Sequence, residues 1–238
     1  MSGDLVTYGW NEMLGDQFAP YAAEGLIPGR IAREHTHLYR VYTANGDLLA
    51  RVTGRFRHEV RGRQDFPAIG DWVALRPATG AGAAQICGVL PRKSRFSRKI
   101  AGTSPEEQVI AANVDTIFLV SALDRDFNLR RLERYLVVAR ESRARPVIVL
   151  NKADLCADIP GAINAVQSIA SDISVHAISC TRAQGFDQLG TYLRTGETVA
   201  LLGSSGGGKS TLINKLLGEE RQRIRDVRVS DRRGRHTT

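Results

Sequence analysis

The sequence contains little cysteine and no long hydrophobic run. Its three cysteines, Cys87, Cys156 and Cys180, are far apart and lack metal-ligand spacing, which argues against a disulfide scaffold and predicts a reducing compartment. No apolar run reaches the roughly 18 residues that a membrane-spanning helix needs, and the N-terminal residues lack the charged-then-apolar pattern of a signal peptide. We therefore expect a cytoplasmic protein with no membrane partner.

Lysine is also scarce: 28 of the 33 basic residues are arginine. The net charge of +8 and the pI near 9.8 indicate a polyanionic partner. Basic residues gather mid-chain and near the C-terminus: Arg92, Lys93, Arg95, Arg98 and Lys99 in the first cluster, and Arg221, Arg223, Arg225, Arg228, Arg232, Arg233 and Arg235 in the second. A solvated face would explain either cluster alone, whereas two clusters and the overall excess favour RNA.

The segment from Gly203 to Ser210 matches the P-loop pattern G-x-x-x-x-G-K-[ST], and it connects an apolar run, 198–202, to a segment with helical spacing, 210–217. Small residues let backbone N–H groups surround a phosphate, and the helix N-terminus adds positive charge. We expect Lys209 to reach the β- and γ-phosphates and Ser210 to coordinate Mg²⁺. The candidate nucleotide-binding residues here are Gly203, Ser204, Ser205, Gly206, Gly207, Gly208, Lys209, Ser210 and Thr211.

A second motif, Asn151-Lys152-Ala153-Asp154, follows the apolar run 146–150 and matches the N-K-x-D pattern that binds guanine. The Asp154 carboxylate can accept from both N1–H and the exocyclic amine of guanine, a donor pair that adenine lacks. We expect Asn151 to tie this loop to the P-loop and the Lys152 stem to cover the base. Ser179 and Cys180 follow a short predicted strand, where GTPases offer backbone N–H groups to guanine O6.

The order of these two motifs is inverted relative to ordinary GTPases, in which the P-loop comes first. The chain therefore resembles a circularly permuted GTPase. Alternating apolar strands and helices over 113–238 predict an α/β fold with a parallel sheet, helices on both faces and ligands at the carboxyl ends of the strands. Short alternating strands over 37–95 and the hairpin signal at Asn45-Gly46 predict a small OB-like β-barrel. Residues 1–36 are expected to form a helical or irregular lead-in, with breaks at Pro20 and Pro28, and 96–112 a basic linker.

Several further segments resemble the RsgA family of ribosome-small-subunit-dependent GTPases. They are Gly70-Asp71-Trp72-Val73, Leu90-Pro91-Arg92, Ala112-Asn113-Val114-Asp115, Arg131-Leu132-Glu133-Arg134-Tyr135-Leu136 and Gly234-Arg235-His236-Thr237-Thr238, beside the two nucleotide motifs. The resemblance implies a GTPase that helps to mature the small ribosomal subunit, whose barrel docks on ribosomal RNA and whose hydrolysis the subunit stimulates. We expect a monomer that uses GTP, GDP and Mg²⁺.

The resemblance also implies roles for residues near the C-terminus. His236 would help to position the attacking water, and Thr238 would approach Mg²⁺ and the γ-phosphate. The family continues with a D-x-P-G segment and a zinc-binding domain with Cys and His ligands, whereas this sequence stops at Thr238. We therefore interpret the chain as a fragment with impaired hydrolysis and without the zinc ligands. An RNA-binding module whose nucleotide site no longer turns over is the alternative.

Gly207 also departs from the family, which usually has valine or another small non-glycine residue at this position. An additional glycine costs roughly 0.5–1 kcal/mol of backbone ordering. We expect weaker nucleotide affinity than in a Gly207→Val variant.

Overall fold

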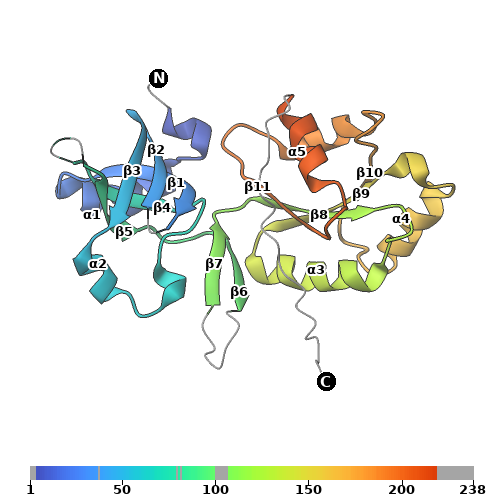
Figure 1. Cartoon of the computed structure of the whole chain (residues 1–238), viewed down its shortest axis with the longest axis horizontal. Coiled ribbons are helices and arrows are strands. Elements are labelled where there is room, and N and C mark those ends of the chain that lie inside the picture. Colours follow the sequence, from blue (N-terminus) through green and yellow to red (C-terminus); the bar gives the residue numbers. More distant parts are fainter. Residues whose placement is uncertain (1–3, 37, 79, 81, 100–106, 219–238) are drawn as a thin grey trace.

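Five strands near the N-terminus close into a barrel, and four later strands form a parallel sheet beside it (Figure 1). The computed structural model describes residues 4–36, 38–78, 80, 82–99 and 107–218. The barrel and the α/β fold with a parallel sheet, both predicted from the sequence, are confirmed. In the described ranges, no helix is long and apolar enough to cross a bilayer.

The barrel strands follow the order β1-β2-β3-β5-β4. They are β1 (Ile27–His35), β2 (Leu38–Thr43), β3 (Gly46–Val52), β4 (Trp72–Arg76) and β5 (Ala84–Val89). β2 and β3 form the predicted hairpin, in which Gly46 has a φ of 108° that glycine adopts without strain. Alternate side chains such as Val41, Val73 and Ile86 point inward and are fully buried. The barrel is therefore filled by its own apolar residues.

The N-terminal segment is helical, as predicted, but its end and the predicted proline breaks differ from the structure. A 3-10 helix, η1 (Leu5–Tyr8), and α1 (Glu12–Ala23) precede the barrel, and Pro20 lies inside α1. Pro28 lies inside β1, so the barrel begins within the segment 1–36 and neither proline is a break. The apolar face of α1 packs Leu14 and Phe18 against Trp72, and this tertiary packing outweighs the local cost of Pro20.

A short helix lies within the barrel segment, where the sequence predicted strands. β3 ends at Val52, and α2 (Gly54–Glu59) follows it. The Thr53 hydroxyl accepts from the Phe56 N–H at 3.0 Å and caps this helix. A second 3-10 helix, η2 (Arg63–Asp65), lies in the polar segment that follows.

The predicted linker contains a β-hairpin. β6 (Arg95–Lys99) and β7 (Glu107–Ala112) pair antiparallel between the barrel and the parallel sheet. Phe96 packs against the core of the parallel-sheet half, and Val109 lies buried near Ala68 of the barrel half. The few apolar residues of this segment thus order a stretch whose basic composition is typical of a linker.

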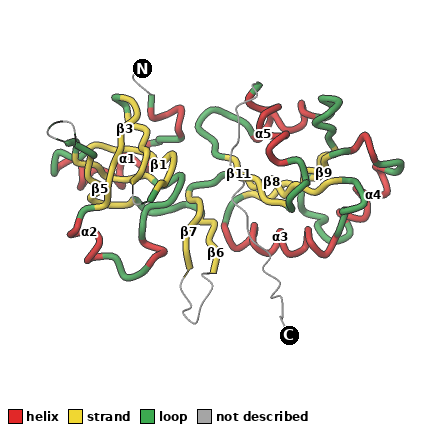
Figure 2. Tube along the Cα trace, in the orientation of Figure 1, coloured by secondary structure: helices red, strands yellow, loops and turns green. Residues whose placement is uncertain are grey.

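The parallel sheet has the order β10-β9-β8-β11, with every pairing parallel. Its elements are β8 (Thr116–Ala122), α3 (Leu129–Ser142), β9 (Arg145–Asn151), η3 (Ala153–Leu155), α4 (Ile159–Gln167), β10 (Val175–Ala177), η4 (Phe186–Tyr192), β11 (Val199–Gly203) and α5 (Lys209–Leu217). α3 and α5 lie on opposite faces of the sheet (Figures 1 and 2). Leu132 and Leu136 of α3 pack on one face and Leu212 of α5 on the other. The last helical segment before β11 is the 3-10 helix η4, which takes the place of an α-helix in this alternation.

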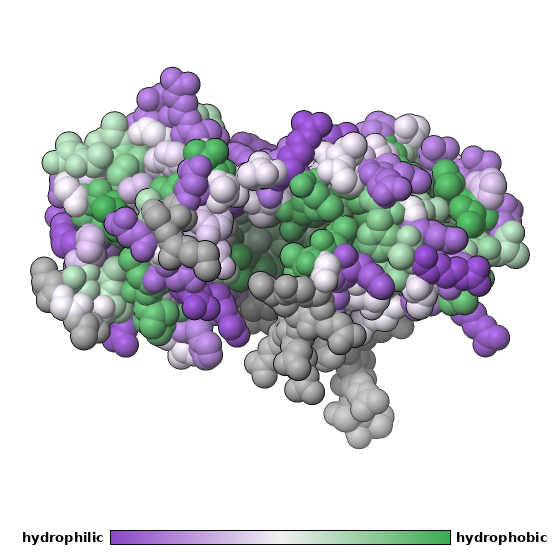
Figure 3. Space-filling view, turned by 90° about the horizontal axis from the view of Figure 1, so that it is seen from above, coloured by the Kyte–Doolittle hydropathy of each residue, from purple (hydrophilic) through white to green (hydrophobic). Residues whose placement is uncertain are grey.

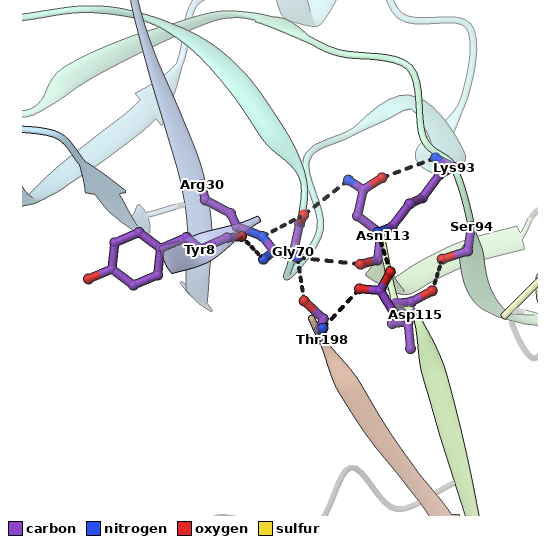
Figure 4. A network of polar contacts seen from close by, with 9 residues as sticks. Tyr8, Arg30, Gly70, Lys93, Ser94, Asn113, Asp115 and Thr198 are labelled. Atoms are coloured by element: carbon purple, nitrogen blue, oxygen red, sulfur yellow. Dashed lines mark hydrogen bonds and ion pairs between the residues drawn. The ribbon is translucent and has the colours of Figure 1, made fainter. Parts of the chain in front are cut away.

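Arg30 on β1 joins the barrel to the parallel sheet (Figure 4). Its guanidinium donates to the Gly70 carbonyl at 3.3 Å and to the Thr198 hydroxyl at 2.7 Å. It also donates to the carbonyls of Tyr8 and Asn113. Because Thr198 directly precedes β11, the contact fixes the barrel against the strand that leads into the P-loop.

Seen from above, hydrophilic residues are spread over the outer surface of both halves (Figure 3).

A buried ion pair holds the end of the barrel. Asp71 is fully buried, and its two carboxylate oxygens accept from Arg92 Nε at 2.8 Å and Nη2 at 2.6 Å. The same guanidinium donates to the carbonyls of Gln64 at 2.5 Å and Phe66 at 2.7 Å. Arg92, which the sequence assigned to an RNA-binding cluster, is therefore committed to the barrel, and Lys93 pairs with Asp115.

We predict that Asp71→Asn lowers the free energy of unfolding of the barrel by about 3 kcal/mol, because the Arg92 charge stays buried without its counter-ion. The ring centroids of Trp10 and of Trp72 in β4 lie 4.9 Å apart, edge to face, and the fluorescence of these two residues reports unfolding in urea. Asp47→Asn, which breaks the exposed Arg40–Asp47 pair, is the control and changes stability by less than about 1 kcal/mol. Equal effects of the two substitutions would contradict the prediction.

Candidate nucleotide-binding site

The P-loop connects β11 to α5 as the sequence predicts. Gly206 and Gly208 have φ values of +83° and +89°, in the left-handed region that glycine adopts without strain. A Cβ on Gly203 would lie 2.3 Å from the Val120 carbonyl oxygen, so the close approach of β11 to β8 also requires glycine. The Lys209 ammonium donates to the carbonyls of Gly203 at 3.0 Å and Ser204 at 2.8 Å, which holds it over the loop.

Asn151 at the end of β9 ties the other motif to this loop. Its Nδ2 donates to the Gly207 carbonyl at 3.1 Å, and its Oδ1 accepts from the Cys180 N–H at 3.3 Å. The side chain is 2% exposed. A Cβ on Gly208 would lie 2.1 Å from Asn151 Nδ2, so the absence of a side chain there leaves room for the amide. The contact expected between Asn151 and the P-loop is present, and it brings three loops together.

Asp154 lies beside the 179–181 segment. Its Oδ1 accepts from the Ser179 hydroxyl at 2.5 Å, and the Thr181 hydroxyl lies 3.3 Å from Oδ2. The Ser179 hydrogen bond is the main cause that lowers the pKa of the Asp154 carboxyl below its usual value. Asp154 is thus ionised at neutral pH and half-buried, as an acceptor for the paired donors of guanine requires.

The backbone N–H groups of Ser179 and Cys180 are already engaged. The Ser179 N–H donates to the Gln184 carbonyl at 3.1 Å, so this residue serves Asp154 through its hydroxyl, a role that the sequence did not predict. The Cys180 N–H donates over a longer 3.3 Å to Asn151. Burial raises the pKa of the Cys180 thiol, which stays neutral in the core below the loop.

Sequence reasoning missed Asp124. This residue follows β8, whose carboxyl end lies between those of β9 and β11, and its Oδ2 accepts from Lys152 Nζ at 2.8 Å. The Lys152 hydrogen bond is the main cause that lowers the pKa of the Asp124 carboxyl. The rule that ligands bind at the carboxyl ends of parallel strands would have indicated it, because Asp124 comes two residues after the end of β8.

Mg²⁺ would find few protein ligands in the described part of the chain. No group of three or more His, Cys, Asp or Glu side chains there could hold a metal ion. Mg²⁺ bound to nucleotides commonly keeps waters and phosphate oxygens and takes only one or two protein ligands, so the exposed hydroxyl of Ser210 in the first turn of α5 fits this pattern. Ser205 and Thr211 are also exposed at this end of the sheet. His236 and Thr238 lie outside the described residues, as does the C-terminal arginine cluster.

Comparison with known proteins identifies the family of this chain. The family model described as RsgA GTPase matches residues 89–238. A relative from Opitutus terrae, named small ribosomal subunit biogenesis GTPase RsgA, is 50% identical over 98% of this chain and 66% of its own length. Similarly named proteins from Lactiplantibacillus plantarum and Methanosarcina acetivorans are 46% and 44% identical over 100% and 97% of this chain, and over 66% and 61% of their own lengths. The chain thus spans slightly under two thirds of these relatives.

Two solved structures share the fold. The crystal structure of YjeQ from Thermotoga maritima has a TM-score of 0.64 and 25% identity, and the match covers 79% of this chain and 64% of that chain. YloQ, described as a circularly permuted GTPase, has a TM-score of 0.57 and 24% identity over 79% of this chain and 63% of its own. At 24% identity, the likeness to YloQ concerns the fold alone.

Gly207 offers a test of the P-loop geometry. Its φ lies outside the left-handed region, and an added Cβ would meet the Ser204 carbonyl oxygen at 3.3 Å, a contact that a shift of a few tenths of an ångström relieves. We predict that Gly207→Val tightens GDP binding about two- to fivefold, because valine restricts the loop in the unbound state. Calorimetric titration of both chains with GDP and Mg²⁺ measures the difference.

Gly208→Ala is the matched control. Its Cβ would displace the Asn151 amide at a φ of +89°, so this variant should bind GDP at least tenfold more weakly. Unchanged or weaker affinity in Gly207→Val would show that the extra glycine carries no cost in this loop.

Proposed function

The chain belongs to the RsgA GTPase family, and from this premise we propose that it binds GTP and GDP where the Asn151 motif meets the P-loop and hydrolyses GTP to GDP and phosphate. We further propose that it acts in the cytoplasm, as a monomer, on the small ribosomal subunit. The relatives' names refer to biogenesis of that subunit.

One observation carries the proposal for the nucleotide. The hydrogen bond from Asn151 to the Gly207 carbonyl joins two motifs that stand in inverted order along the sequence. This contact supports the inference that the P-loop binds the phosphates and Asp154 binds the guanine of one nucleotide at this edge of the sheet. A lone P-loop would support only phosphate binding.

Each motif contributes a different part of the chemistry. The glycine-rich turn and the N-terminus of α5 present backbone N–H groups and a positive field to the phosphates, and Lys209 adds a charge that moves from the loop carbonyls to the phosphates. Ser210 would hold Mg²⁺, which would neutralise charge on the phosphate oxygens. His236 is proposed to help to position the attacking water, and Thr238 to approach Mg²⁺ and the γ-phosphate. Positioning and charge stabilisation supply most of the acceleration in phosphoryl transfer.

The barrel and the excess of basic residues support ribosomal RNA as the partner. The net charge of +8 favours a polyanion, and small barrels of this topology bind oligonucleotides on one face. Because Arg30 fixes the barrel to the residue before β11, docking of the barrel would be felt at the strand that carries the P-loop. We assign residues 113–238 to the GTPase domain.

We predict that the chain prefers GDP to ADP by at least about 100-fold, because adenine would leave the Asp154 carboxylate without its two donors. In Asp154→Asn, GDP binding falls by a similar factor and xanthosine diphosphate binds better than GDP, since the amide can donate to the 2-oxygen of xanthine. Calorimetry with Mg²⁺ measures all three nucleotides.

Asp158→Asn controls for loss of charge near the loop. Asp158 caps α4 through Gly161 N–H at 2.9 Å, a role that asparagine also fills, so its GDP affinity should match that of the unsubstituted chain. Equal binding of GDP and ADP by the unsubstituted chain would refute the guanine site.

Partner choice has a separate test. The chain should sediment with purified small ribosomal subunits in the presence of a non-hydrolysable GTP analogue, and raising the salt concentration should release it, because phosphate contacts displace counter-ions. Equal binding to large subunits under the same conditions would contradict the proposed partner.

A further inference from the structure

Lys152 adopts a backbone conformation that lysine rarely takes. Its φ is 62° and its ψ is 35°, in the left-handed region, where a residue with a Cβ is strained. The residue stands between Asn151, which contacts the P-loop, and Asp154, which is proposed to bind the base edge. Such strain at a site persists where surrounding contacts fix the conformation.

Asp124 supplies the contact that fixes the Lys152 side chain. The ammonium lies 2.8 Å from Asp124 Oδ2, and the two side chains are only 33% and 26% exposed. This carboxylate is the one ion-pair partner of Lys152 among the described residues. The contact bridges the carboxyl ends of the neighbouring strands β8 and β9, so the lysine stem extends along the edge of the sheet where the nucleotide motifs meet.

The carboxylate of Asp124 is itself held in place. Its Oδ1 accepts from the Asp126 N–H at 2.9 Å, so each of its oxygens has a different partner. The Asp126 carboxylate pairs with Arg131 of α3 at 2.7 Å. The turn at 124–126 is thereby fixed to α3. Of the two carboxylates in this turn, the one that pairs with Lys152 is that of Asp124.

We propose that Asp124 is a positioning residue for guanine recognition, which acts by holding the Lys152 stem where it covers one face of the base. The inference rests on the proposed function of the site. Without the carboxylate, the four-carbon stem would regain its rotamer freedom, and nucleotide binding would have to order it again. The Lys152 hydrogen bond holds the pKa of the Asp124 carboxyl below its usual value, so this carboxyl is ionised at neutral pH.

A double-mutant cycle with GDP as the probe tests this role. Asp124→Asn should weaken GDP binding about three- to tenfold, the range expected for a partly buried hydrogen-bonded ion pair. Lys152→Met keeps an apolar stem and removes the ammonium, so adding Asp124→Asn to Lys152→Met should change the affinity less than about twofold. Calorimetry in Mg²⁺ gives the four dissociation constants.

Asp126→Asn is the matched control, because it breaks the pair with Arg131 and leaves Lys152 untouched; its GDP affinity should stay within about twofold of the unsubstituted chain. An unchanged affinity in Asp124→Asn would overturn the inference. A loss that persists in the Lys152→Met background would also overturn it, since Asp124 would then act on the fold of the turn. If the unsubstituted chain binds no GDP, the proposed function itself fails, which is a distinct result.

Discussion

The buried amide of Asn151 is the contact on which the geometry of the nucleotide site depends. Its Nδ2 donates to the Gly207 carbonyl of the P-loop, and its Oδ1 accepts from the Cys180 N–H in the segment that follows β10. Both contacts are shielded from water, because the side chain is 2% exposed, and neither acceptor nor donor is left unpaired. Gly208 leaves the space that this amide occupies. The two loops proposed to bind the phosphates and the base are thus joined through one side chain.

The sheet makes this contact possible despite the inverted order of the motifs. β11 and β9 both pair with β8, so the P-loop and the Asn151 loop emerge on either side of one central strand. β8 is buried along its whole length and ends at the turn that carries Asp124. The proposed site therefore depends on adjacent strand ends, and the inverted order of the motifs leaves these ends adjacent. The Arg30 contacts extend the same rigid frame to the barrel.

Much of this arrangement could be predicted from local sequence. Apolar runs predict β8, β9 and β11, and the spacing of Leu132 and Leu136 predicts α3, because each pattern reflects burial against one core. The P-loop and the Asn151 motif could be predicted because they recur with fixed spacing.

The features that were missed depend on tertiary contacts. α1 continues through Pro20 because of its packing on Trp72, and the β6–β7 hairpin forms because its few apolar residues reach two different cores. Asp124 and the Ser179 hydroxyl reach Lys152 and Asp154 only because loops far apart in the sequence meet. The central claim is that the two motifs form one guanine site, and a crystal structure of the chain with GDP tests it most directly. The account predicts the guanine N1 and exocyclic amine on the Asp154 carboxylate, with the diphosphate inside the loop from Gly203 to Ser210. A diphosphate in that loop with the base away from Asp154 would contradict it.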